Sequence, residues 1–270
     1  MAQQRQPFQV MGILNVTPDS FSDGGRYNSV SSALQRAEQM VVAGATWLDV
    51  GGESTRPGAA GVAEQEELDR VIPVIEALSR EFAVQISVDT SKAQVMREAV
   101  HAGAAMINDV RALREPGALA AAAESNVKVC LMHMVGQPRT MQDAPEYGNV
   151  VNEVKLFLQD RMRVCEQAGI ARERLLLDPG FGFGKTVRHN YELLHRLACF
   201  QEFEVPLLIG VSRKSMLGKV TGRDVEQRLA ASIAAATIAM MKGAAILRVH
   251  DVAETMDAVK VVTATLTGEY

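Results

Sequence analysis

The stretch that decides the fold is ISVDTSKAQVMREAVHAGAAMIND, residues 86–109. A short apolar run ends on Asp89, a segment long enough for a helix follows over residues 92–101, and a second apolar run ends on Asn108. Runs of valine, isoleucine and leucine suit strands that are buried on both faces. This stretch therefore predicts a strand–helix–strand unit of a parallel sheet.

The same unit recurs along the whole chain. Eight apolar runs, most of which stop on a polar or charged residue, are separated by segments of helical length. We expect strands at residues 9–15, 47–51, 84–89, 105–109, 127–133, 175–178, 207–211 and 245–249. Eight strand–helix units predict a closed (β/α)8 TIM barrel, a fold whose chemistry takes place where the strands end.

Length and composition suit one globular domain. Of the 270 residues, 47% are apolar and 22% are charged, so the chain can bury a large core. No linker rich in proline, serine or glycine divides it. We therefore expect a single barrel domain over residues 1–270.

Charge and cysteine usage restrict the partners and the compartment. A formal net charge of −4 argues against nonspecific binding of nucleic acid, although local Arg and Lys residues can still hold an anionic small molecule. Cys130, Cys165 and Cys199 lack metal-ligand spacing and suit a reducing cytosol. No secretory signal or membrane-spanning segment is visible, so we expect a cytoplasmic protein.

The segment LAASIAAATIAMM, residues 229–241, is apolar on every side, whereas a barrel helix normally presents a polar face to water. Its small residues could pack tightly under neighbouring helices. Alternatively, a second subunit covers its outer face. We favour the second reading, which predicts a homodimer.

The ends of the first two strands carry candidate ligand groups. The Asn15 carboxamide can bind Mg²⁺, which takes few protein ligands and keeps most of its waters, although an Asn can also simply hold the turn. Arg56, in ESTRPG, has the planar fork that recognises phosphate. For Glu53 we expect a structural role as the buried partner of a neighbouring arginine.

Three further strand ends carry carboxylate or carboxamide groups, namely Asp89, Asn108 and Asp178. Together they can line one side of the barrel mouth and bind the N–H groups of a flat heterocycle. Because no metal-ligand histidines lie near them in the sequence, a metal site there is the weaker reading. Asp49 and Asp109 can be helix caps or acceptors within their loops.

The segment DPGFGFGKT, residues 178–186, looks like a phosphate-binding P-loop but fails the pattern. Pro179 stands where the P-loop requires its first glycine. We expect instead a backbone that approaches a planar ligand closely, with the Phe183 ring aimed at that ligand.

The loops after the last two strands supply positive charge. Lys214 lies in SRKS, and Arg248 and His250 lie in RVH. In a (β/α)8 barrel these two loops often form a phosphate site. Lys214 could be a solvated cation, but among the nearby carboxylates we expect it to donate to a carbonyl or ring nitrogen of a ligand. His133 has no obvious partner and reads as a structural histidine.

With these motifs in this order, the chain resembles the bacterial dihydropteroate synthases over about residues 10–264. The resemblance rests on ILNVTPDSFSDGG, LDVGGESTRPG, SVDTSK, INDV, DPGFGFGK, SRKS and RVHDV. That family joins 6-hydroxymethyl-7,8-dihydropterin diphosphate to 4-aminobenzoate and releases diphosphate, a step of folate biosynthesis that sulfonamides inhibit. The resemblance implies Mg²⁺ as a cofactor.

The resemblance also implies roles for individual residues. The pterin would be bound by Asp89, Asn108, Val110, Met132, Asp178, Lys214 and Arg248. The diphosphate would be bound by Asn15, Arg56, Arg248 and His250, with Asn15 as the Mg²⁺ ligand. The aminobenzoate pocket would consist of Phe21, Thr55, Pro57, Phe183, Lys214 and Ser215. Catalysis would rest on Lys214, Asp89, Asp178 and Arg248, around a cationic pterin that the aminobenzoate amine attacks.

Three other readings are open from the residues. The pterin-dependent methyltransferases share the barrel and the pterin site, but they do not need STRPG or the anion-binding groups. A Schiff-base aldolase would use Lys214 as its nucleophile. A folate-binding barrel without catalysis would have no turnover, although Asn15, Arg56 and His250 are all present here.

Overall fold

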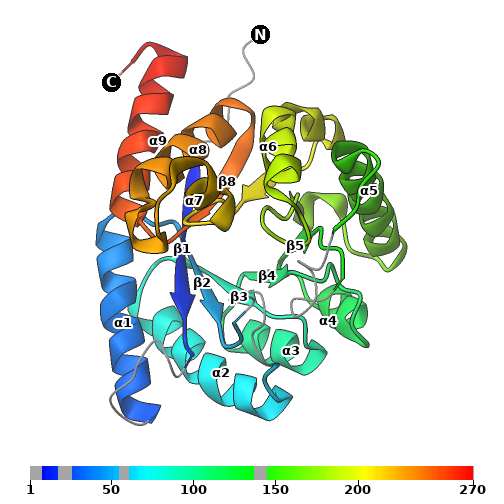
Figure 1. The fold of residues 1–270 in the computed structure, drawn as a ribbon. Coiled ribbons are helices and arrows are strands. Elements are labelled where there is room, and N and C mark those ends of the chain that lie inside the picture. Colours follow the sequence, from blue (N-terminus) through cyan, green and yellow to red (C-terminus); the bar gives the residue numbers. More distant parts are fainter. Residues whose placement is uncertain (1–7, 18–25, 55–60, 137–144, 270) are drawn as a thin grey trace.

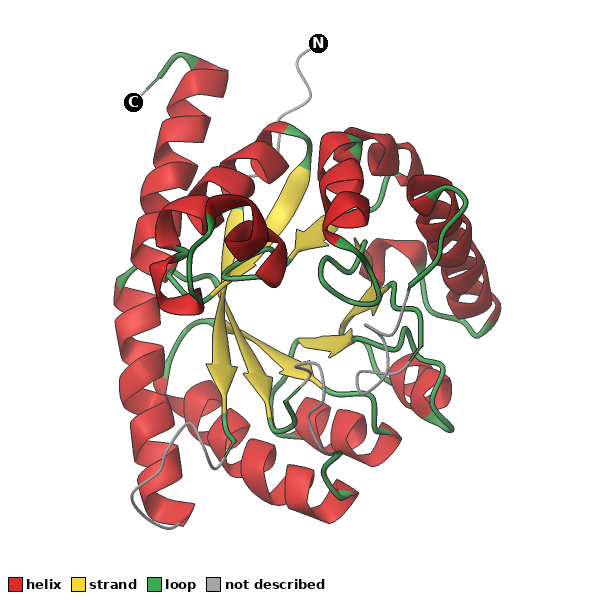
Figure 2. Ribbon diagram, in the orientation of Figure 1, coloured by secondary structure: helices red, strands yellow, loops and turns green. Residues whose placement is uncertain are grey.

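Eight parallel strands close into a barrel in chain order, and the last strand, β8, pairs with the first, β1. The computed structural model describes residues 8–17, 26–54, 61–136 and 145–269. Figures 1 and 2 show the strands around the centre of the molecule and the helices outside them. The predicted (β/α)8 barrel is confirmed.

The strands follow the apolar runs, and each lies within two residues of its expected bounds. They are β1 Gln9–Asn15, β2 Trp47–Gly51, β3 Gln85–Asp89, β4 Met106–Asp109, β5 Lys128–Met132, β6 Leu175–Asp178, β7 Leu207–Ile209 and β8 Ala244–Val249. The α-helices are α1 Arg26–Val42, α2 Glu64–Glu81, α3 Ala93–His101, α4 Ala118–Glu124, α5 Val150–Gln167, α6 Val187–His195, α7 Ser215–Thr221, α8 Leu229–Met241 and α9 Val252–Thr267.

The interior of the barrel is apolar at its floor and polar at its mouth. Because side chains alternate along a strand, every second residue points inward. The floor is a buried cluster of such residues: Met11, Trp47, Met106, Cys130, Leu176, Leu208 and Ile246. Two residues further along β2, β4, β6 and β8 stand Asp49, Asn108, Asp178 and Arg248. The alternation along the strands thus places a layer of polar side chains directly above the apolar floor.

The apolar helix α8 has two different faces. One face is buried against the molecule through Ala235, Ala239 and Met240. The other leaves Ile238 44% exposed and Met241 51% exposed. Neighbouring α9 adds Val261, which is 66% exposed. Tight packing therefore accounts for one side of α8 and leaves an apolar outer surface.

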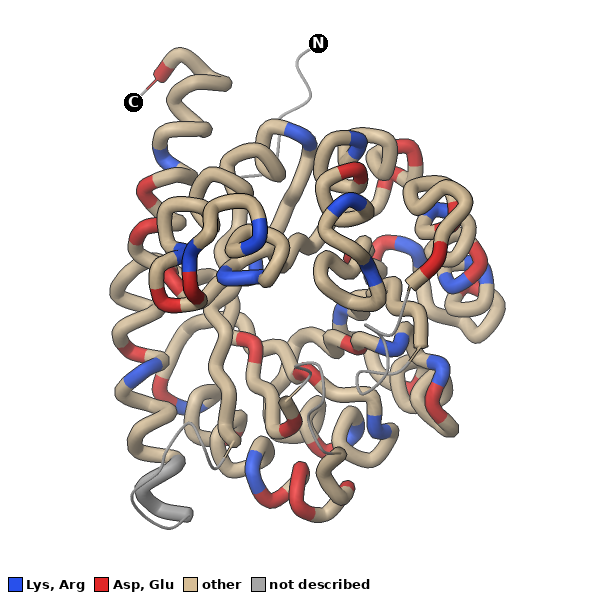
Figure 3. Tube along the Cα trace, viewed as in Figure 1, with Lys and Arg blue, Asp and Glu red and all other residues tan. Residues whose placement is uncertain are grey.

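Charged residues of both signs are interspersed over the helices rather than separated onto opposite sides of the view (Figure 3). No helix in the described ranges is long and apolar enough to cross a membrane.

Candidate active site

Arg248 lies between two buried carboxylates at the barrel mouth. Its Nε is 2.5 Å from Asp49 Oδ2, and a terminal nitrogen is 2.8 Å from Asp89 Oδ2. Asp49 is completely buried, and its Oδ2 also accepts a hydrogen bond of 3.1 Å from the Asn108 amide. The reading of Asp49 as a cap or loop acceptor is therefore wrong. It anchors two of the predicted site residues, whereas Asp109 does bond within its own loop.

Burial governs the titration of this cluster. Desolvation raises the pKa of Asp89 to about 7, although Arg248 acts in the opposite direction. Burial also acts to lower the pKa of Arg248, but the adjacent Asp49 and Asp89 outweigh it and hold that pKa above its ordinary value. Arg248 therefore stays charged, while the raised pKa of Asp89 places its protonation near neutral pH.

Strand register brings Asn15 to the same level as Asp89. Asn15 pairs with Gly51 across the β1–β2 ladder, and Gly51 pairs with Asp89 across β2–β3. A Cβ on Gly51 would lie 3.7 Å from Asn15 Oδ1 and 3.8 Å from Asp89 Oδ2. The two oxygens thus border the same small space above a glycine, where a Cβ would make ordinary van der Waals contacts.

Asp178 ends β6 and is held by the turn that follows it. Its Oδ1 accepts a hydrogen bond of 2.7 Å from the Gly180 N–H, and burial raises its pKa to about 6. Gly180 has φ +72°, and a Cβ there would lie 1.9 Å from the His133 carbonyl oxygen. Glycine is required at this position because the loop passes directly against the end of β5.

The aromatic ring of this loop closes one wall of the mouth. Phe183 packs in a buried cluster with Val110, Met132 and Met134. Lys214 Nζ lies 4.2 Å from the centroid of the Phe183 ring. Burial, with a contribution from Arg248, lowers the pKa of Lys214 to about 8. The Lys214 ammonium group thus lies against this apolar wall, with its charge over the face of the Phe183 ring.

Lys185 turns into the protein instead of toward a ligand, which agrees with rejection of the P-loop. Its Nζ lies 2.9 Å from His133 Nδ1 and donates to the carbonyls of Gly180 and Phe183 at 2.8 and 3.0 Å. His133 is 3% exposed, and burial next to Lys185 lowers its pKa to about 2. His133 is thus a structural histidine, as expected, and its partner is Lys185. Together the two side chains hold the loop after β6 against the end of β5.

Replacing Lys185 by methionine should lower the free energy of unfolding by about 2–4 kcal/mol, because buried acceptors would lose their donor. In a chain of this size that corresponds to roughly a 5–10 °C fall in Tm. Lys260→Met is the matched control, since Lys260 is 72% exposed and pairs with Asp257 on the surface. Thermal unfolding followed by circular dichroism measures both. Equal Tm values for the two variants would contradict this role of Lys185.

The loops after β7 and β8 are joined to each other. Ser212 Oγ lies 3.0 Å from His250 Nδ1, and the Arg213 guanidinium pairs with Asp251 at 2.5 Å. Burial, followed by the nearby Arg248 and Arg213, lowers the pKa of His250 to about 4. His250 is therefore neutral at ordinary pH. It follows Arg248 by two residues, at the same end of the barrel.

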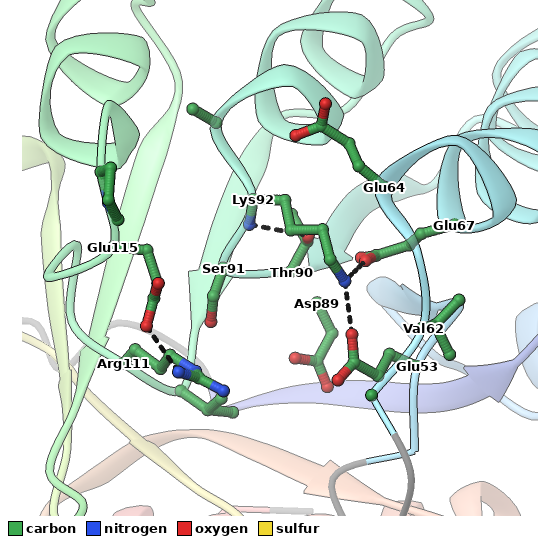
Figure 4. A pocket seen from close by; sticks show the side chains of 14 residues that line it. Glu53, Val62, Glu64, Glu67, Asp89, Thr90, Ser91, Lys92, Arg111 and Glu115 are labelled. Atoms are coloured by element: carbon green, nitrogen blue, oxygen red, sulfur yellow. Dashed lines mark hydrogen bonds and ion pairs between the residues drawn. The ribbon is translucent and has the colours of Figure 1, made fainter. Parts of the chain in front are cut away.

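A cavity of about 400 Å³ opens beside the cluster (Figure 4). Asp89 and Val110 line it, as do Glu53, Glu67 and Lys92. Lys92 Nζ bonds to both Glu53 and Glu67, and Glu67 is 1% exposed. Glu53 thus has the expected structural role, but its partner is a lysine and not an arginine. A cation between two carboxylates braces this wall.

The structure brings most of the predicted site residues to one end of the barrel. Those at the mouth are Asn15, Asp89, Asn108, Val110, Met132, Asp178, Phe183, Lys214, Arg248 and His250. Ser215 is exposed at the first position of α7. Phe21, Thr55, Arg56 and Pro57 lie outside the described residues. Sequence reasoning missed Asp49 and Met134.

Known proteins match nearly the whole chain. A family model described as pterin binding enzyme matches residues 11–250. The dihydropteroate synthase of Escherichia coli is 60% identical over 260 residues, 96% of this chain and 92% of that protein.

Solved structures agree with the sequence matches. A Yersinia pestis dihydropteroate synthase in complex with a sulfonamide drug superposes with a TM-score of 0.93 at 58% identity, covering 97% of this chain and 95% of that one. A Xanthomonas albilineans dihydropteroate synthase with 4-aminobenzoic acid gives 0.92 at 54% identity, covering 97% and 94%.

Proposed function

The chain belongs to the pterin-binding enzymes and, within them, to the dihydropteroate synthases, which are transferases; from this premise we propose the reaction and the residues that carry it. The protein joins 6-hydroxymethyl-7,8-dihydropterin diphosphate to 4-aminobenzoate and releases diphosphate. Residues 1–270 form one pterin-binding domain. The observation that carries the proposal is the polar layer around Arg248, which stands above an apolar floor and beside the Phe183 wall.

The central cluster suits the pterin ring. Asp178 and Asp89 offer carboxylate oxygens to ring N–H groups, and Asn108 offers an amide that Asp49 holds in place. Val110, Met132 and Phe183 supply apolar surface for a flat ring. Arg248 lies with its charge next to both carboxylates, where its planar group can stack on the pterin.

The diphosphate would lie against the positively charged side of the mouth. Arg248 and His250, together with Arg56, contribute donors to its oxygens. Asn15 fits Mg²⁺, because its carboxamide oxygen borders the same small space as Asp89 Oδ2 and Mg²⁺ needs few protein ligands. Within the described ranges, no cluster of three His, Cys, Asp or Glu forms a metal site. When bound, Mg²⁺ would neutralise charge that develops on the leaving diphosphate.

Departure of diphosphate leaves a positively charged pterin methylene. Asp89 and Asp178 would stabilise that charge, and Lys214 would hold the pterin through a ring nitrogen or carbonyl. The aminobenzoate amine then attacks, which needs no strong general base because the aniline nitrogen is already nucleophilic. Its pocket would consist of Phe183, Lys214 and Ser215 with Phe21, Thr55 and Pro57. Positioning of the two substrates supplies much of the rate.

The function is tested by mixing the protein with the pterin diphosphate, 4-aminobenzoate and Mg²⁺ and measuring released diphosphate. Sustained release over many turnovers should require all three additions, and Lys214→Ala should abolish turnover. A protein that only binds folates would release none in either form, and absence of release from the wild type would overturn the assignment.

A para-amino sulfonamide should inhibit competitively with 4-aminobenzoate. Support comes from the related Yersinia pestis enzyme, which is solved with a sulfonamide drug, and from the Xanthomonas albilineans enzyme, which is solved with 4-aminobenzoic acid. The apparent KM for 4-aminobenzoate should rise with inhibitor while the maximal rate stays constant. A benzenesulfonamide without the para-amino group is the control and should be far weaker. Inhibition that excess 4-aminobenzoate does not relieve would contradict the shared pocket.

The exposed face of α8 supports a homodimer. Ile238 and Met241 present apolar surface there, and Val261 is exposed on the neighbouring helix α9. We expect light scattering at micromolar concentration to give twice the mass of the chain. Ile238→Glu should shift the protein to monomer, whereas Leu156→Glu, at an exposed position of α5 on the other side of the barrel (Figure 1), should not. A monomeric wild type would refute the dimer.

The compartment we propose is the cytoplasm. Cys130, Cys165 and Cys199 are all unpaired thiols, as a reducing compartment would keep them.

A further inference from the structure

Ser212 makes two contacts with His250, and together they define which ring nitrogen carries the proton. The hydroxyl oxygen Oγ lies 3.0 Å from His250 Nδ1, and the backbone N–H of His250 donates to the same Oγ at 3.2 Å. Ser212 is 5% exposed, so solvent has little access to its hydroxyl.

A serine hydroxyl has one proton to donate. The backbone N–H of His250 already occupies an acceptor position of Ser212 Oγ. If Nδ1 also donated to Oγ, the hydroxyl proton would need another acceptor. In the part of the chain that the structure describes, Ser212 Oγ has no other acceptor within hydrogen-bond distance. The hydroxyl therefore donates to Nδ1, and the ring proton of neutral His250 lies on Nε2.

The surroundings favour this neutral form. The positive charges that act on His250 are Arg248 of β8 and, from the loop after β7, Arg213 and Lys214. The one opposing charge in the same set is Asp251, which Arg213 already pairs. A further positive charge on the ring would be repelled by its neighbours. A neutral ring with an N–H adds a hydrogen-bond donor without adding charge.

The loops are fixed independently of the Ser212 hydroxyl. Arg213 pairs with Asp251, its backbone N–H donates to Ser232 Oγ at 2.9 Å, and its carbonyl accepts from Arg228 at 3.0 Å. The His250 carbonyl accepts a bond of 3.4 Å from Arg36. Loss of the Ser212 hydroxyl should therefore leave the positions of both loops unchanged, but the proton of the His250 ring would no longer be held on Nε2.

We propose that Ser212 is a positioning residue that holds His250 as the Nε2–H tautomer, so that the ring presents a hydrogen-bond donor to the diphosphate of the first substrate. This role rests on the proposed function, in which His250 binds diphosphate. His250 lies two positions after Arg248 and directly follows the end of β8, so both residues stand at the same end of the barrel. A neutral imidazole can carry its proton on either nitrogen, and Ser212 thereby selects the form in which Nε2 is the donor.

The tautomer can be read directly and without turnover. Long-range ¹H–¹⁵N spectra of ¹⁵N-histidine-labelled protein separate protonated from unprotonated ring nitrogens, and the chain has five histidines. The His250 signals are those missing from a His250→Gln variant. We expect the Nε2–H pattern in the wild type and in Ser212→Thr, which keeps the hydroxyl. An Nδ1–H or a doubly protonated ring in the wild type at pH 7.5 would overturn the proposal, whatever happens to the variants.

Kinetics test the consequence. Ser212→Ala should raise both the KM for the pterin diphosphate and the inhibition constant of inorganic diphosphate about tenfold, the loss expected for one hydrogen bond. The KM for 4-aminobenzoate should stay constant, and Ser212→Thr should restore the other two values. Ser87→Ala is the matched control, because the buried Ser87 hydroxyl has no hydrogen-bond partner in the described ranges.

The outcomes separate this role from the proposed function. An unchanged inhibition constant in Ser212→Ala, with the ring proton no longer held on Nε2, would overturn the role of Ser212 while the enzyme assignment stands. A wild type that shows the Nε2–H ring but neither turns over nor binds inorganic diphosphate would overturn both.

Discussion

Replacing Arg248 by methionine should lower the free energy of unfolding by about 3–5 kcal/mol, the usual cost of leaving buried charges without their partner. Asp49 is completely buried and Asp89 is 7% exposed, and both lose the same guanidinium. Turnover should be abolished in the same variant, because the pterin and the diphosphate both depend on this side chain in the proposed site.

The control for Arg248→Met is the same substitution at Arg80, whose pair with Glu76 is largely exposed on α2. Exposed pairs contribute about 0–1 kcal/mol, so Arg80→Met should be nearly neutral. Urea unfolding measures both variants. Asp49→Asn combined with Arg248→Met should recover part of the loss, since it removes one of the stranded charges. Equal stability of the two single variants would show that the cluster does not hold the barrel mouth together.

The instability of Arg248→Met should grow as the pH rises. Without the guanidinium, desolvation would raise the pKa of Asp89 above its present value of about 7. A carboxyl group whose pKa is higher in the folded protein stabilises the fold below its unfolded pKa and loses that effect as the pH rises through the folded pKa. The deficit relative to wild type should therefore be smaller at pH 5 than at pH 8.

Asp178→Asn should weaken binding of the pterin diphosphate about 100-fold, because a hydrogen bond to a charged group is worth about 1.5–3 kcal/mol and each 1.4 kcal/mol is tenfold. Oδ1 of Asp178 is occupied by the Gly180 N–H, so the second oxygen is the one available to the ligand. An asparagine can keep the first bond but offers no charge. Calorimetric titration without 4-aminobenzoate measures the affinity, with Asp257→Asn on the exposed face of α9 as control.

The pH dependence of the same binding follows from burial. The pKa values of Asp178 and Asp89 are raised to about 6 and about 7, so both groups take up protons as the pH falls below neutral. A protonated carboxyl cannot accept from the ring N–H groups as strongly, and wild-type affinity should fall between pH 7.5 and pH 5. The slope should be smaller for Asp178→Asn. Equal slopes would show that Asp178 does not contact the ligand.

The barrel could be predicted from the sequence because each buried strand is a short continuous apolar run, which can be recognised without knowing its distant neighbours. Asp89, Asn108 and Asp178 could be found for the same reason, since each stands at the end of its run. Asp49 lies two residues before the end of β2, inside the strand, and no local pattern there indicates a function. Its importance comes from the ion pair with Arg248 of β8. Its role depends on a contact between distant segments.

Other details depended on geometry that no local pattern contains. Lys185 points inward because the turn at Gly180 places a backbone carbonyl near its Nζ. Its other partner, His133, comes from the end of the neighbouring strand β5. Glu53 meets Lys92 because α3 begins beside the end of β2. The short helix α7 follows Lys214 directly, in a segment, SMLGKVT, with no apolar period to announce it.

The pairing of β8 with β1 has a consequence for synthesis on the ribosome. Asp49 and Asp89 emerge early, and Arg248 emerges close to the end of the chain. Until then, the barrel has open edges at β1 and β7, and two carboxylates bound for the interior have no guanidinium beside them. Their burial becomes favourable when the last strand arrives. We therefore expect closure of the barrel to complete the proposed binding site, so that a nascent chain without β8 should not hold substrate.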